Sequence, residues 1–348
     1  MTTDRGDLHF PFPAPPLPGE VISVADGVLW TRLPLPFSLN HINIYLIEDQ
    51  GGWAVLDTGI SDAITREIWQ ALQAGPLKGM RLTRIIVSHF HPDHVGLAHW
   101  LCHTFDAPLL TNETCYTLTS GLTAPGSLRS TPTASEIAHY LSHGLPAYLA
   151  ESILPPEAYF AIVSDAPPTE YMRIEDGDRL SIGGRDFAVI SGNGHAKNQL
   201  MLHAPDDSLL FAADQIMARI TPNVGVSPSE PDENALDGFI TTLQELVTKV
   251  PDSSLILPGH ERPFEGIALR AQQLIQHHED RCGLILRACD QNPHSVADMM
   301  PILFTRPLDH DQIAMAFGEA LAHVNYLVNR DELNWIEEKD GVQRLIRA

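Results

Sequence analysis

Six consecutive residues, His-Phe-His-Pro-Asp-His at positions 89–94, constrain this chain more than any other stretch. The three imidazoles and the carboxylate in this span can all bind a metal ion. The apolar run at 84–88 before them is typical of a buried strand, and residues 95–101 after them are typical of the start of a helix. The sequence therefore predicts a ligand-bearing turn at the carboxyl end of a strand.

The spacing within this hexapeptide predicts how the ligands divide. Alternate side chains of a strand lie on one face, so we expect His89 and His91 to reach one ion together. Asp93 and His94 lie past the turn and can serve a second ion. Chance clustering is the alternative, because the chain contains 17 histidines, but an ordinary core does not need three imidazoles and a carboxylate in six residues.

The pattern H-x-H-x-D-H resembles the signature of the metallo-β-lactamase superfamily and matches it without departure. In that family the remaining ligands follow later strands. This chain offers a candidate near the end of each of three apolar runs, namely His195, Asp214 and His260. All three stand in the family's order, and the resemblance covers residues 20–265.

The resemblance implies a centre of two divalent ions, each with its own ligand group. Nitrogen and oxygen donors suit zinc, with iron and manganese as alternatives. Two such ions share a water and lower its pKa toward neutrality, so that a metal-bridging hydroxide attacks the substrate. The implied ligands are His89, His91 and His195 for one ion and Asp93, His94 and His260 for the other, with Asp214 as a bridge and with Asp93 and Asp214 as the catalytic carboxylates.

An Asp-Thr-Gly sequence beginning at Asp57 follows the apolar run at 53–56 and resembles a strand-end motif of the same family. The resemblance implies that Asp57 lies behind the ligands, where such a carboxylate fixes the orientation and basicity of an imidazole. A helix cap or a turn aspartate is the alternative interpretation.

Two features bear on the branch of the family. No cysteine lies near the ligand segments, so β-lactamases that use a thiolate ligand are a poor match. The added Asp93-His94 pair resembles the glyoxalase II, lactonase and ribonuclease Z-like branches. The segment that contains His195 departs from the common G-H-T-P-G-H form, because Gln199 replaces the second histidine, and this puts the glyoxalase subgroup in doubt.

The order of apolar runs predicts an α/β chain, and the resemblance implies a four-layer αβ/βα sandwich. We expect a proline-rich extended arm at 1–20 and a catalytic domain at 21–265. Residues 105–175 interrupt it as an insertion, which either caps the pocket or packs away from it. Residues 266–348 predict three helices and a hairpin, which resemble a small winged-helix domain with a docking, lid or dimer role.

The composition of the chain limits the substrates and partners that we expect it to bind. The net charge of −22 repels polyphosphate backbones and favours small neutral or cationic substrates, so we expect a small-molecule substrate and no nucleic acid. A homodimer is the protein partner that we consider. No apolar run is long enough to cross a bilayer, and residues 1–7 lack a secretory pattern. We therefore expect no membrane partner. The four scattered cysteines favour reduced thiols and a cytoplasmic location.

These features predict a dinuclear metal-dependent hydrolase that cleaves a thioester or lactone in a small molecule. One alternative is a phosphodiesterase or endoribonuclease with the same metals, which the C-terminal region supports and the charge opposes. A di-iron redox protein would need a flavodoxin-like domain for which this length leaves no room. A non-catalytic sensor is the last alternative, and the complete ligand set argues against it.

Overall fold

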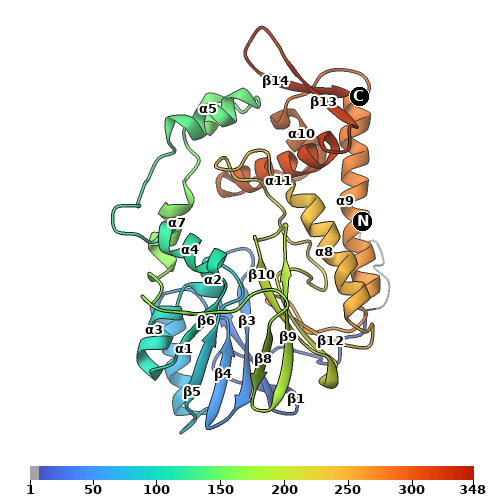
Figure 1. The fold of residues 1–348 in the computed structure, drawn as a ribbon. Helices are drawn as coiled ribbons and strands as arrows, with labels where there is room; N and C mark the ends of the chain where they lie inside the picture. Colours follow the sequence, from blue (N-terminus) through green and yellow to red (C-terminus); the bar gives the residue numbers. More distant parts are fainter. Residues whose placement is uncertain (1–7) are drawn as a thin grey trace.

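The computed structural model describes residues 8–348, and of residue 311 only the backbone. Two sheets stand face to face with helices on their outer sides, and further helices lie across one end (Figure 1). This is the predicted four-layer αβ/βα sandwich with a C-terminal helical region. Residues 1–7 of the expected arm lie outside the described residues.

The first sheet has seven strands in chain order, antiparallel from β1 to β4 and parallel from β4 to β7. Its middle strands are buried on both faces, because Ile44 faces the outer helices whereas Tyr45 faces the other sheet. The strands are β1 (Ile22–Ala25), β2 (Val28–Pro34), β3 (His41–Asp49), β4 (Gly52–Leu56), β5 (Leu82–Ile86), β6 (Leu109–Thr111) and β7 (Met172–Arg173).

The second sheet has five strands in the order β12-β11-β10-β9-β8, with β11 and β12 parallel. Because parallel neighbours end at the same edge, the segments after β11 and β12 leave the sheet together. The strands are β8 (Arg179–Ile182), β9 (Arg185–Gly192), β10 (Gln199–Ala204), β11 (Leu209–Ala213) and β12 (Leu255–Pro258).

Three apolar clusters hold these layers together. One fills the space between the sheets, and a second packs α1 (Ala63–Ala74) and α3 (Ala98–Phe105) on the first sheet. The third joins the second sheet to α8 (Ala235–Lys249) and to all three C-terminal helices, α9 (Ile267–Cys289), α10 (Val296–Leu303) and α11 (His310–Val328). The C-terminal region thus shares a core with the second sheet. The predicted hairpin follows as β13 (Leu333–Glu337) and β14 (Gln343–Arg347).

The insertion contains more structure than the sequence predicts. The sequence of the insertion predicts two short helices, around 135–144 and 146–153, whereas the structure has four, together with β6 and β7, which extend the first sheet. One helix packs on the C-terminal region, where the rings of Tyr140 and Phe317 lie 5.0 Å apart. Another lies beside the hexapeptide, where Phe90 stacks on Phe160 at 6.3 Å. The helices are α4 (Glu113–Leu122), α5 (Ala134–Ser142), α6 (Ala147–Ala150) and α7 (Pro156–Val163).

Two element boundaries differ from the prediction. The apolar residues of 21–33 predict a strand there, but a turn at Gly27 interrupts it, and the φ of 63° at this position suits a residue without a side chain. The helix expected at 95–101 is split into α2 (Pro92–Val95) and α3. Among the described residues, none of the helices combines the length and apolarity needed to cross a bilayer.

Candidate metal centre

The metal-binding hexapeptide lies at an edge where backbone hydrogen bonds join the two sheets. The amide of Leu200 donates to the carbonyl of Ser88 at 2.8 Å, which ties the hexapeptide loop to β10. The amide of Asn43 donates to the carbonyl of Gly259 at 2.7 Å, which ties β3 to the segment after β12. These bonds join the first sheet to the second at the edge where the ligand segments lie.

His89 and His91 meet as expected, but for a different reason. β5 already ends at Ile86, so the two residues are not alternate members of a strand. The chain instead turns at Pro92, which opens α2 in a position where a missing N–H costs nothing. This turn brings His89 Nε2 within 2.9 Å of His91 Nδ1.

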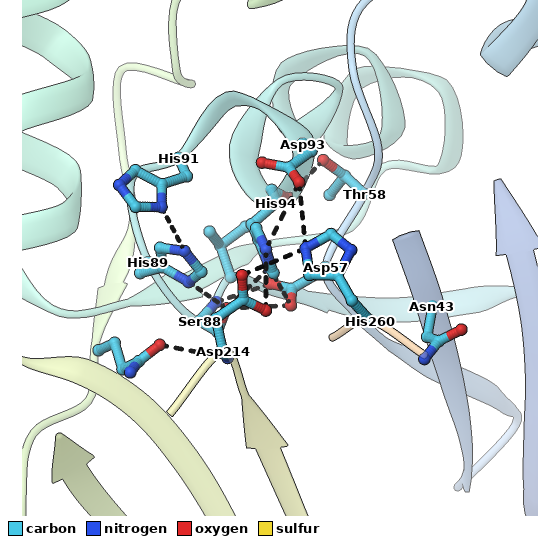
Figure 2. A network of polar contacts seen from close by, with 12 residues as sticks. Asn43, Asp57, Thr58, Ser88, His89, His91, Asp93, His94, Asp214 and His260 are labelled. Atoms are coloured by element: carbon cyan, nitrogen blue, oxygen red, sulfur yellow. Dashed lines mark hydrogen bonds and ion pairs between the residues drawn. The ribbon is translucent and has the colours of Figure 1, made fainter. Parts of the chain in front are cut away.

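Three overlapping groups of three potential ligands form at this edge, and two of them share no residue, whereas the remaining one joins His89 and His94 to Asp214. In each group the ligand atoms lie within 4.8 Å of one another. Of the two that share no residue, we call the first the three-histidine group, which consists of His89, His91 and His195, and the second the aspartate group, which consists of Asp93, His94 and His260. Their side chains converge from the hexapeptide loop and the neighbouring strand ends, as Figure 2 shows for all of them except His195.

Asp214 lies between the two groups. Its Oδ2 atom is 3.5 Å from His195 Nε2 and 3.2 Å from His260 Nε2, and its Oδ1 atom is 3.5 Å from His94 Nε2. The carboxylate therefore touches both groups at once, as a bridging ligand must. The structure thus brings all seven predicted ligand residues together.

The imidazoles are oriented by partners on their outer nitrogens. His94 Nδ1 donates to Asp57 Oδ2 at 2.8 Å, and His260 Nδ1 donates to the carbonyl of His41 at 2.6 Å. His195 Nδ1 donates to the carbonyl of Asn223 at 2.9 Å. Partners of this kind fix the ring orientation and leave Nε2 as the nitrogen that faces the centre of the site.

The residues present fit divalent metal ions. Among the described residues, three buried polar atoms of the site have no hydrogen-bond partner: Nε2 of His94, Nε2 of His195 and Oδ1 of Asp214. Orphaned atoms of this kind require an explanation, and an ion is one. Gly259 adds to the fit, because a Cβ atom there would lie 2.3 Å from Asp214 Oδ1 and would crowd the same space.

The imidazoles of the three-histidine group and those of the aspartate group differ in the direction of their pKa shifts. Burial and the neighbouring imidazoles lower the pKa of His91 to about 3 and that of His89 well below its ordinary value. Burial also opposes a charge on His260, but the carboxylates of Asp214 and Asp93 outweigh this effect and raise its pKa to about 10. The pKa of His94 is raised in the same way against burial, first by Asp214.

Four residues near the centre were not singled out by their sequence pattern. His41 and Asn223 contribute backbone carbonyls, which carry no side-chain signal. Phe37 and Tyr159 form an aromatic pair with ring centroids 5.4 Å apart. Burial and, to a lesser degree, the carboxylate of Asp93 raise the pKa of Tyr159.

The fold and the double ligand group together define a metal-dependent hydrolase of the αβ/βα-sandwich class. The chain belongs to the metallo-beta-lactamase superfamily, because the profile described as "Metallo-beta-lactamase superfamily" matches residues 38–260. A second profile, "Metallo-beta-lactamase-like, C-terminal domain", matches residues 282–348. The resemblance stated from the hexapeptide is thereby confirmed.

Several known proteins resemble this chain along most of its length. A beta-lactamase domain protein from Burkholderia ambifaria has a solved structure with 35% identity and a TM-score of 0.89, over 98% of both chains. The probable metallo-hydrolase YqjP of Bacillus subtilis is 20% identical over 87% of this chain and 92% of its own. The acyl-coenzyme A thioesterase MBLAC2 of Bos taurus is 23% identical over 75% of this chain and 87% of its own.

Proposed function

We propose that the chain hydrolyses a thioester or a similar activated ester in a small molecule, with two divalent ions held by the seven ligand residues. One observation carries the proposal: the ligand atoms form two groups that share the carboxylate of Asp214. Two ions in such a site supply Lewis acidity and lower the pKa of water toward neutrality. No protein nucleophile is then needed.

Two carboxylates of the site, Asp93 and Asp214, supply negative charge next to the imidazoles. Burial opposes ionisation of Asp93, but the imidazoles of His94 and His260 lower its pKa to about 2. The pKa of Asp214 is held well below its ordinary value in the same way, chiefly by His260. Both carboxylates therefore stay ionised at neutral pH and can accept hydrogen bonds from water or substrate.

An aromatic wall beside the aspartate group supports an acyl group as substrate. Phe160 is buried behind Phe90, whereas the neighbouring Tyr159 is 39% exposed and pairs with Phe37 at 5.4 Å. Apolar walls with few polar groups are typical of small-molecule sites. These contacts support the proposal that part of the insertion caps the pocket.

The similarity to an acyl-coenzyme A thioesterase supports the thioester, and the net charge of −22 opposes a phosphodiester polymer. Zinc is the ion that we propose, because imidazole and carboxylate donors suit it. We also propose that the protein acts in the cytoplasm, where its four cysteines stay reduced.

A substrate panel tests this function. The full-length protein is loaded with Zn²⁺ and assayed on an acyl-coenzyme A thioester, a simple lactone and bis-nitrophenyl phosphate, with a chelator-treated sample as control. We expect turnover of the thioester that is lost on chelation. Turnover of the phosphodiester alone would support the endoribonuclease-like alternative, and ion binding without any turnover would support the sensor.

A further inference from the structure

The orienting partner of His195 is itself held by the C-terminal helices. The carbonyl of Asn223 accepts the hydrogen bond from His195 Nδ1 at 2.9 Å. The side-chain amide of the same Asn223 donates to Glu319 Oε2 on α11 at 3.1 Å. The other carboxylate oxygen of Glu319 is paired with Arg281 on α9. A continuous polar chain therefore runs from a candidate metal ligand to two helices beyond residue 266.

The backbone beside Asn223 is attached to the same helix. The amide of Val226 donates to the carbonyl of Gly318 at 3.1 Å. A Cβ atom on Gly318 would lie 3.0 Å from the Val226 carbonyl, so the missing side chain permits this close approach. Val224 and Val226 are buried in the core cluster that contains α11. The loop that orients His195 is thus fixed by α11 at several neighbouring points.

This arrangement distinguishes His195 from the other imidazoles. His94 is oriented by Asp57 and His260 by the carbonyl of His41, and both partners belong to the first sheet or its loops. The Asn223 loop, in contrast, depends on α11 for its position. The polar chain from the C-terminal helices through Asn223 therefore leads to the three-histidine group.

The chemistry of the Glu319–Arg281 pair argues for more than packing. Glu319 is only 9% exposed, and burying an ion pair commonly costs more than apolar residues of the same volume would. One carboxylate oxygen of Glu319 also accepts a hydrogen bond from Asn223, and packing of α9 against α11 does not require this contact. Arg281 is held in turn by the ring of Phe304, with its guanidinium 4.7 Å from the centroid. The pair thus presents a fixed acceptor to the loop.

We propose that Glu319, held by Arg281, is a positioning residue for His195 and thereby sets the affinity of the three-histidine group for a divalent cation. This inference rests on the metal-binding part of the proposed function. In this proposal the C-terminal helices position one ligand of the metal centre.

The test uses Zn²⁺ binding by the full-length protein without any assay of activity. Chelator-treated protein is titrated with Zn²⁺ against a competing chromophoric chelator, and the absorption of Co²⁺ reports the ligand field of each group. We expect Asn223→Ala and Glu319→Gln each to weaken one of the two binding events by up to about 10-fold, the lower end of the loss for an outer-shell partner, because both variants keep the Asn223 carbonyl and remove only the contact that positions it. The second event should keep its wild-type affinity.

Leu321→Ala is the matched control, because this residue of α11 is buried two positions from Glu319 and its side chain has no polar atom that could hold Asn223. It should lower the unfolding midpoint and leave both Zn²⁺ affinities unchanged. The double variant Asn223→Ala/Glu319→Gln should weaken binding no more than either single change, since both act through one contact. If Glu319→Gln does not fold, Asn223→Ala carries the test.

Three results would overturn the proposal. These are an equal weakening of both binding events in the variants, no change in either event, and the same selective loss in Leu321→Ala. If the wild-type protein bound no Zn²⁺ at all, this inference and the proposed function would fall together. If the wild type bound two ions and the variants bound them equally well, the inference alone would fail.

Discussion

The chain buries two sets of histidines, and their surroundings differ in a way that separates ligands from packed residues. At the sheet edge, imidazoles converge on the carboxylate of Asp214 and are held from behind by oxygen atoms. Between α9 and α11, His278 Nδ1 and His323 Nε2 lie 3.0 Å apart, and His323 Nδ1 donates to the Glu319 carbonyl at 2.7 Å. The second set bonds along a line instead of toward a common centre.

The electrostatics show the same contrast. Burial lowers the pKa of His278 to about 2 and that of His323 to about 3, and no carboxylate offsets it. At the sheet edge, carboxylates raise the pKa of His260 to about 10 in spite of burial. Burial alone therefore identifies neither set as functional, and the convergence of imidazoles with carboxylates is the useful criterion. The sheet-edge set should respond to metal ions, and the helical pair should respond only to acid.

The largest effect should follow from removal of the shared carboxylate. Asp214→Ala should abolish most Zn²⁺ binding at both groups and reduce turnover by more than the roughly 10- to 100-fold typical of an outer-shell partner. The reason is that its oxygens lie within 3.5 Å of imidazoles from both groups. Zn²⁺ titration and the thioester assay measure this, with the exposed Asp206→Ala as control. Wild-type binding in Asp214→Ala would remove the distinction between the two sets.

A second prediction concerns protons that compete with the ion. His260, with a pKa raised to about 10, carries a proton at pH 7 that must leave before Nε2 can bind. Zn²⁺ affinity of the aspartate group should therefore rise about tenfold per pH unit for each proton released. His91, with a pKa of about 3, is already neutral, so the three-histidine group should show little dependence.

Zn²⁺ titrations at pH 6, 7 and 8 measure both affinities, and the proton release can be checked by calorimetry in buffers of different ionisation enthalpy. Equal slopes for the two binding events would show that the groups do not differ in charge as the structure indicates.

A third prediction sharpens the role of Asp57, whose carboxylate holds both His94 and the Ser88 hydroxyl. Asp57→Asn keeps the size of the side chain and removes its charge. Affinity of the aspartate group for Zn²⁺ should fall about 10- to 100-fold, with a smaller loss at the three-histidine group. Asp206→Asn serves as the matched control in the same titration. An unchanged affinity would mean that Asp57 only closes a turn at its positive φ of 64°.

The sequence predicts the histidines and carboxylates at the sheet edge better than it predicts the groups that orient them. All seven ligands and Asp57 were predicted, because a ligand needs a particular side chain and the family places it after a strand. Asn223 was not, since its carbonyl orients His195 and every residue has a carbonyl. The insertion was only partly predicted, because β6 and β7 have three and two residues and are too short for a periodic pattern. The winged-helix interpretation of residues 266–348 stays a prediction.

The smallest effect concerns the helical pair and acid. An unfolded histidine has a pKa near 6.5, so below that pH the unfolded chain takes up protons that buried His278 and His323 cannot. The free energy of unfolding should therefore fall as the pH drops from 7 toward the folded pKa values of about 2 and 3. At pH 5 the loss should be on the order of 1–2 kcal/mol for each histidine.

Chemical denaturation of the metal-free protein at pH 7.5 and pH 5 measures this loss. The double variant His278→Gln/His323→Gln should lose less stability on acidification than the wild type, whereas a change at an exposed histidine, His103→Gln, should not alter the difference. Zn²⁺ binding should be the same in all three proteins, because the pair lacks the converging carboxylates of the sheet edge. Acid sensitivity that persists in full in the double variant would place its origin among the other buried histidines instead.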